Sequence, residues 1–106
     1  MEYILFIHHN RHNRHNRHQN HADSRATAAE WEHFFSVARA SGMFTGGSEI
    51  DNRLLLGKSN LPPITDTVGG FMRFSTDDKN ALLSLLNQHP VLVHGGSLEL
   101  CEMPRR

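Results

Sequence analysis

The chain has 106 residues and a mass of 12.0 kDa, and its 11 Lys and Arg balance its 11 Asp and Glu. This length fits one small domain, so we expect a single domain over 1–106. No apolar run approaches the roughly 18 residues of a membrane-spanning helix, so we expect no membrane partner. A lone cysteine, Cys101, excludes an internal disulfide and favours a reducing cytoplasmic location.

The first predicted element is a short apolar strand, Tyr3 to Ile7. It is too short for a secretory signal and lacks a small-residue cleavage site. Its apolar residues are consecutive and not alternating, which is typical of a strand that is covered on both faces.

Residues 8–21 read HHNRHNRHNRHQNH, a near-perfect triplet repeat of Asn-Arg-His without an apolar residue. Such a segment cannot contribute to a core, so we expect an exposed loop insertion. Weak, non-specific binding of Ni²⁺, Cu²⁺ or Zn²⁺ is expected there, through His8, His9, His12 and His15. No carboxylate or thiolate completes a defined metal site, and no aromatic residue is interleaved to stack on bases. We therefore expect no cofactor and no specific nucleic-acid binding.

A helix is predicted over about 25–41. Thr27 and Glu30 have the spacing of a capping box, and Gly42 suits the end of the helix. Its apolar stripe consists of Trp31, Phe34, Phe35 and Ala38. A candidate strand follows over 43–50, with 53–56 as its hairpin partner and an irregular segment over 58–66.

The second half predicts a strand over 68–74, a helix that Ser75 opens and Pro90 ends, and a final strand over 97–103. This βαββαβ order implies an α+β, ferredoxin-like domain with a four-stranded antiparallel sheet and both helices on one face. The first strand is apolar on both sides, so something must cover the helix-free face. A second copy of the chain is the candidate, which predicts a homodimer.

Several short motifs agree in order and spacing with the YCII-related family, including its DGPF branch. They are the strand from Met1, the helix that contains Trp31 and ends in Ala40-Ser41-Gly42-Met43, the pairs Gly46-Gly47, Gly69-Gly70 and Gly95-Gly96, the dipeptide His89-Pro90, and Leu98-Glu99-Leu100. The chain resembles this family over nearly its whole length apart from 8–21. The resemblance implies a dimeric α+β barrel built from ferredoxin-like subunits.

The chain also departs from the family pattern. Lys58-Ser59-Asn60-Leu61 stands where the DGPF tetrapeptide is expected. The YCII branch carries a helix histidine and an aspartate that are proposed as an active-site pair, and Trp31 and His89 stand at those positions here. The resemblance therefore implies a fold, and it leaves open whether the protein is an enzyme.

The candidate ligand-pocket residues are Trp31, Asp66, Arg73, His89 and His94. His89 is either a general base or donor, or a histidine that the helix dipole stabilises at the end of the second helix, with His94 in an exposed loop; the structural role is favoured. Arg73 either binds an anionic ligand or forms a salt bridge, and the salt bridge is favoured. For Trp31 we favour a role in core packing. For Cys101 we favour a buried structural thiol over a nucleophile.

Three function hypotheses follow from these residues. The first is small-ligand binding between the sheet and the helices, by a binding protein or a vestigial enzyme. The second is a regulatory or interaction module without chemistry, and the third is metal binding by the histidine repeat.

Overall fold

The computed structural model describes residues 1–8, 26–58 and 66–104. The predicted loop therefore lies outside the described residues from residue 9 onward, as do the expected metal ligands His9, His12 and His15. Within the described ranges, no helix is long and apolar enough to span a bilayer.

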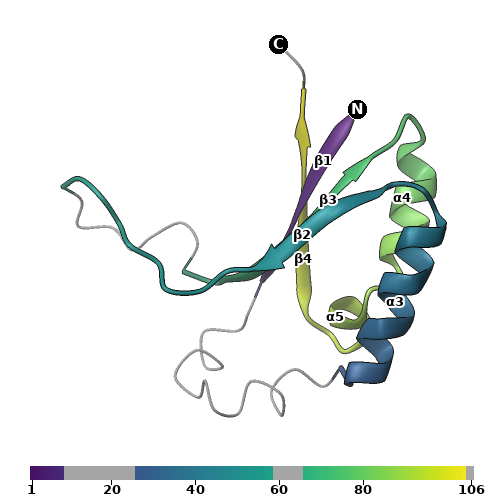
Figure 1. The fold of residues 1–106 in the computed structure, drawn as a ribbon, viewed down its shortest axis with the longest axis horizontal. Helices are drawn as coiled ribbons and strands as arrows, with labels where there is room; N and C mark the ends of the chain where they lie inside the picture. Colours follow the sequence, from purple (N-terminus) through teal and green to yellow (C-terminus); the bar gives the residue numbers. More distant parts are fainter. Residues whose placement is uncertain (9–25, 59–65, 105–106) are drawn as a thin grey trace.

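The described chain is an α+β structure with one four-stranded antiparallel sheet, consistent with a ferredoxin-like fold (Figure 1). The strands are β1 (Glu2–His8), β2 (Phe44–Glu49), β3 (Val68–Ser75) and β4 (Ser97–Met103), in the order β2-β3-β1-β4. The helices are α3 (Ala28–Ala40), α4 (Lys79–Leu86) and α5 (Pro90–Val93), and all of them lie on the same side of the sheet. The predicted sheet and the predicted placement of the helices are confirmed.

The first helix begins where its capping box predicts. The Thr27 side chain accepts a hydrogen bond from the Glu30 N–H at 3.1 Å, while Glu30 Oε1 accepts from the Thr27 N–H at 3.3 Å. Thr27 is therefore the N-cap, and α3 starts at Ala28 and not near residue 25. Gly42, with a φ of 76°, follows the helix in the left-handed conformation that favours glycine.

Three further expectations about the elements were wrong. Ser75 ends β3, and the helix is opened by Asp78, whose side chain accepts a hydrogen bond from the Ala81 N–H at 3.0 Å. The same helix ends at Leu86, and Pro90 begins α5, because proline fits the first turn of a helix. The segment 53–56 forms no strand, since β2 pairs directly with β3.

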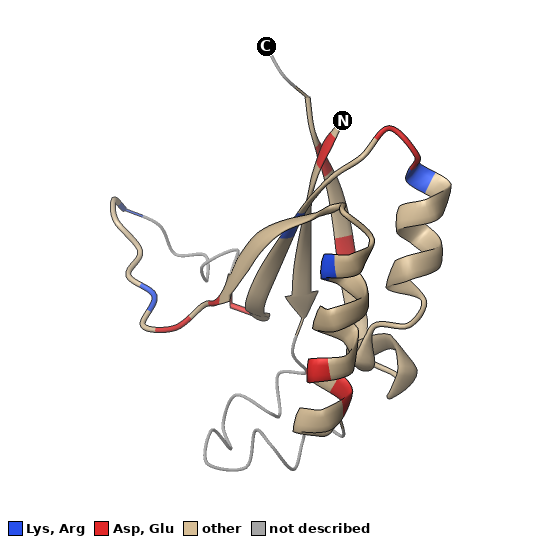
Figure 2. Cartoon of the chain, turned by 45° about the vertical axis from the view of Figure 1, so that its right-hand side comes forward, with Lys and Arg blue, Asp and Glu red and all other residues tan. Residues whose placement is uncertain are grey.

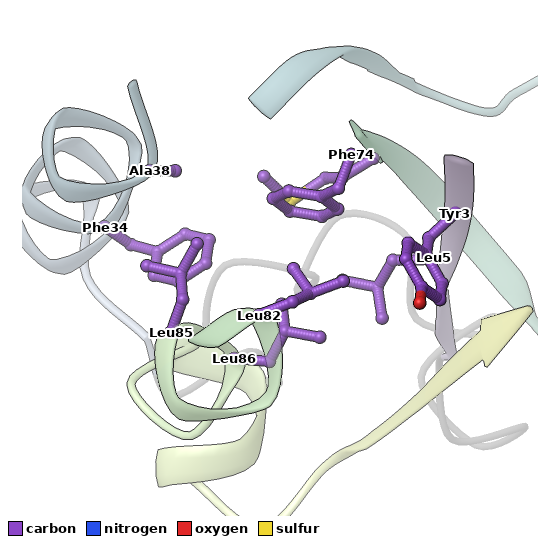
Figure 3. Close-up of a cluster of buried hydrophobic side chains, with 9 residues drawn as sticks. Tyr3, Leu5, Phe34, Ala38, Phe74, Leu82, Leu85 and Leu86 are labelled. Atoms are coloured by element: carbon purple, nitrogen blue, oxygen red, sulfur yellow. The ribbon is translucent and has the colours of Figure 1, made fainter. Parts of the chain in front are cut away.

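The core lies between the sheet and the two longer helices (Figure 3). Side chains from α3 and α4 point toward those of β1 and β3. The buried cluster consists of Tyr3, Leu5, Phe34, Ala38, Met72, Phe74, Leu82, Leu85 and Leu86. Gly47 lets β2 approach β3, because a Cβ there would clash with the carbonyl oxygen of Phe71.

The two faces of the sheet differ in burial. On β1, Tyr3 and Leu5 face the helices and are buried, whereas Ile4 and Phe6 face away and are half-buried. Phe6 pairs with Phe71 of β3 on this helix-free face. The described chain therefore covers one face of the first strand and leaves the apolar residues of the other face partly exposed.

Candidate functional site

The candidate site surrounds α5, a four-residue helix with a histidine at each end. His89 is its N-cap, and the Nδ1 atom accepts a hydrogen bond from the Val91 N–H at 3.1 Å. His94 is its C-cap. His89 therefore starts a new helix, and it is not the C-terminal histidine of α4 that the sequence led us to expect.

His89 is fully buried among aromatic rings. Its ring centroid lies 4.7 Å from that of Phe34 and 5.0 Å from that of Trp31, with an interplanar angle of 87° to the indole. The side chain is 0% exposed, and its Nε2 atom has no hydrogen-bond partner among the described residues. A buried polar atom without a partner costs about 1–3 kcal/mol, so its retention calls for an explanation.

The protonation state of His89 follows from these contacts. Burial lowers the pKa of His89 from 6.5 to about 4, so the ring is neutral at pH 7. Because Nδ1 accepts a hydrogen bond, the single proton of the neutral ring resides on Nε2. The site therefore holds a neutral N–H donor that has no acceptor in the described ranges of the chain.

Trp31 covers His89 from the first helix. Its indole stacks on Phe35, with ring centroids 5.8 Å apart. Trp31 is half-buried and lies outside the buried cluster, to which α3 contributes Phe34 and Ala38. The favoured prediction of core packing was therefore wrong for Trp31, whose described ring contacts are with Phe35 and His89.

The second histidine pairs with a carboxylate. His94 Nε2 lies 2.7 Å from Glu30 Oε2, and both side chains are about one-third exposed. The hydrogen bond from His94 is the largest cause that lowers the pKa of Glu30, and the hydrogen bond from the Thr27 backbone adds to it. The expected exposed loop position is wrong in its exposure, because His94 is half-buried in a turn where it contacts Glu30. The consecutive residues Glu30 and Trp31 contact the two histidines that bound α5.

This arrangement provides a hydrogen-bond acceptor on His94 and a hydrogen-bond donor on His89. Carboxylates only accept, so the Nε2–H of His94 donates to Glu30, and a neutral His94 carries its lone pair on Nδ1. His89 supplies a donor, and the rings of Trp31 and Phe34 supply an apolar wall. The site can therefore hydrogen-bond an oxygen acceptor beside a planar apolar group.

Figure 2 shows that α3 carries acidic residues near its start and a basic residue in its last turn.

The other candidate residues lie elsewhere. Arg73 lies on the helix-free face, where its Nη2 atom is 3.8 Å from Glu2 Oε1, as the salt-bridge alternative predicted. Asp66 is half-buried in the turn before β3. Cys101 is half-buried on the helix-free face, opposite Ile4. The structure thus brings together Trp31, His89 and His94, and it places Arg73 on the other side of the sheet.

Within the part of the chain that the structure describes, no group of three or more His, Cys, Asp or Glu residues could hold a metal ion. His8, the described member of the expected metal set, contacts Glu99 and Thr67. Glu30, Glu99 and Thr67 were missed as site residues. Their histidine partners lie 59 to 91 residues away in sequence, so no local motif could identify them.

Comparisons with known proteins identify no family: no family model and no curated protein matches the chain. Among solved structures, the chain is similar to 5-chloro-2-hydroxyhydroquinone dehydrochlorinase from Burkholderia phenoliruptrix AC1100, in complex with 2,5-dihydroxybenzoquinone. The TM-score is 0.47 and the sequence identity is 13%, over 100% of this chain and 96% of that chain.

Proposed function

We propose that the protein is a YCII-like homodimer that binds a small ligand through His89 and Trp31. The observation that carries the proposal is the fully buried His89 Nε2–H, which has no acceptor among the described residues. An acceptor atom of a ligand would remove the cost of this unpaired donor, and this gain is available only to a ligand that reaches Nε2.

The surroundings of this donor define the ligand. A neutral imidazole donates to a carbonyl, hydroxyl or phenolic oxygen without requiring a full negative charge. The rings of Trp31, Phe34 and Phe35 favour a planar apolar body. Trp31 is half-buried and contacts the His89 ring. A ligand would reach Nε2 by displacing the indole. The ligand class is therefore a small aromatic or conjugated molecule with an acceptor oxygen.

The experiment is a screen of small phenols and aromatic carbonyl compounds by thermal shift, followed by titration calorimetry. We expect His89→Phe, which keeps a ring but lacks the donor, to weaken binding about tenfold or more, the value of one hydrogen bond. Arg73→Ala is the control, because Arg73 lies on the opposite face. Ligands that bind wild-type and His89→Phe protein equally well would overturn this site.

A second candidate function is an interaction module without chemistry. Leu54 and Leu56 are 82% and 81% exposed in the segment that follows β2. Together with Leu55 between them, which is 47% exposed, these leucines can form a contact surface for another protein. The double variant Leu54→Ser and Leu56→Ser should abolish capture of a partner while it leaves small-molecule binding unchanged. If that variant retains every captured partner, this alternative fails.

A further inference from the structure

His8, the last residue of β1, joins two other side chains at the end of the sheet. Its Nε2 atom lies 2.8 Å from Glu99 Oε1 on β4, and its Nδ1 atom lies 3.0 Å from Thr67 Oγ1, directly before β3. Antiparallel pairing brings these residues together, because β1 lies between β3 and β4. The set is separate from His89, since it forms where the strands meet and involves no residue of α3 or α5.

The donors and acceptors of these two contacts fix the position of the protons. Glu99 can only accept as a carboxylate, so the Nε2–H of His8 donates to it. In the neutral ring, Nδ1 then carries the lone pair and accepts the hydroxyl proton of Thr67. In this arrangement a carboxylate orients an imidazole, and the imidazole is hydrogen-bonded to a hydroxyl. The same arrangement activates the nucleophile in hydrolytic triads.

The strand register contributes to this arrangement. Ile7 pairs with Gly70, but His8 pairs with Val68, so β3 contains one extra residue at this point. This bulge brings Thr67 one position closer to His8 than regular pairing would, and bulges commonly redirect side chains in this way. The side chains of His8 and Glu99 are 26% and 60% exposed, so a small molecule can reach the group.

We propose that Glu99, His8 and Thr67 form a triad that hydrolyses small esters. Thr67 Oγ1 bonds to the ester carbonyl carbon as its proton passes to His8 Nδ1, and the carbon–oxygen bond to the alcohol breaks. The alcohol leaves with that proton. Water then attacks the acyl-threonine, His8 takes a proton from the water and returns it to Thr67 Oγ1, and the acid is released. Glu99 is a positioning residue that holds the ring of His8.

The substrate class follows from the neighbouring residues. Phe6 is half-buried and pairs with Glu99 on β4 and with Phe71 on β3, so apolar rings lie beside the triad on the helix-free face. Because we expect a second copy of the chain to cover these rings, a substrate reaches the triad from the end of the sheet, which favours esters with a compact acyl group.

The test is acid-quenched hydrolysis of p-nitrophenyl acetate by the full chain, read by p-nitrophenolate release and by mass spectrometry of the acetylated peptides. We expect an acetyl ester on Thr67. Thr67→Ala should lose that ester and release p-nitrophenolate about 100-fold more slowly, while Thr67→Ser should retain both. Glu102→Gln, on the same strand as Glu99, is the matched control and should behave as wild type.

The role of Glu99 has its own readout. Nitrogen NMR of His8 should show the Nε2–H tautomer in wild-type protein. In Glu99→Gln, both this tautomer and the rate of p-nitrophenolate release should be lost. Glu99→Asp should restore part of the tautomer population and part of the rate. Acetyl groups found elsewhere but not on Thr67, or a Thr67→Ala variant with the wild-type rate, would overturn the triad. An unchanged tautomer and rate in Glu99→Gln would overturn the role of Glu99. None of these variants touches Trp31 or His89, so either result is independent of the ligand site.

Discussion

At the scale of single residues, the burial of His89 makes the fold sensitive to acid. The unfolded chain binds a proton on His89 near pH 6.5, whereas burial lowers the pKa of the folded chain to about 4. Between these values the unfolded state binds more protons, so this residue destabilises the fold as pH falls from 6.5 to 4, by about 3 kcal/mol in total. Urea unfolding at several pH values in this window measures the effect.

The matched variant is His89→Asn, whose side chain can still accept the Val91 N–H at the N-cap but does not titrate. We expect it to be less stable than wild type at pH 7, because it fills less space between Trp31 and Phe34. Its stability should fall less steeply from pH 6.5 to pH 4. If the two proteins lose stability in parallel across this range, His89 does not control the acid response.

A second residue-scale prediction concerns Glu30. The hydrogen bond from His94 lowers the pKa of Glu30 in the folded chain. The carboxylate therefore stabilises the fold at pH values above its ordinary pKa of 4.5, and this contribution is lost as pH falls through the lower pKa of the folded chain. Glu30→Gln should therefore be less stable than wild type at pH 7 and approach it under more acidic conditions. Glu32→Gln, an exposed position on the same helix, is the control. A stability difference that is the same at every pH would contradict this role.

At the scale of elements, the capping box sets the start of α3. Thr27→Ala removes the acceptor for the Glu30 N–H and should lower the free energy of unfolding by about 1 kcal/mol. Thr27→Ser keeps a hydroxyl at the same position and should stay within a few tenths of a kcal/mol of wild type. Urea unfolding at pH 7 distinguishes the two. Equal losses in both variants would show that the methyl group of Thr27, and not its hydroxyl, matters here.

Elements whose signals are local could be predicted from the sequence. The apolar stripe and capping box of α3 and the alternation of β4 each lie within one segment, and the structure has both elements. Pro90 was misleading because the same residue both prevents a helix from continuing and suits the first turn of the next one. The site was predictable only as separate residues: the sequence pointed to Trp31 and His89, but their contact depends on how α3 packs against α5.

At the scale of the whole molecule, the helix-free face of the sheet is the surface that the described chain leaves without a covering layer. Ile4, Phe6 and Phe71 lie there half-buried, with the Arg73–Glu2 pair beside them. Apolar residues paired across neighbouring strands gain from burial against a second sheet, and the same face of another copy is self-complementary under two-fold symmetry. We therefore expect sedimentation velocity at micromolar concentration to give twice the chain mass of 12.0 kDa.

Phe71→Asp should convert this homodimer to a monomer, because pairing the two faces would bury a carboxylate without a partner. Leu83→Asp is the control, since Leu83 is 43% exposed on α4 and lies on the helix side of the sheet. Cys101 reports on the same interface in wild-type protein, as it is half-buried on the helix-free face. Its alkylation by iodoacetamide should slow as protein concentration rises. A wild-type monomer whose Cys101 reacts at the same rate at every concentration would show that this face stays open in solution.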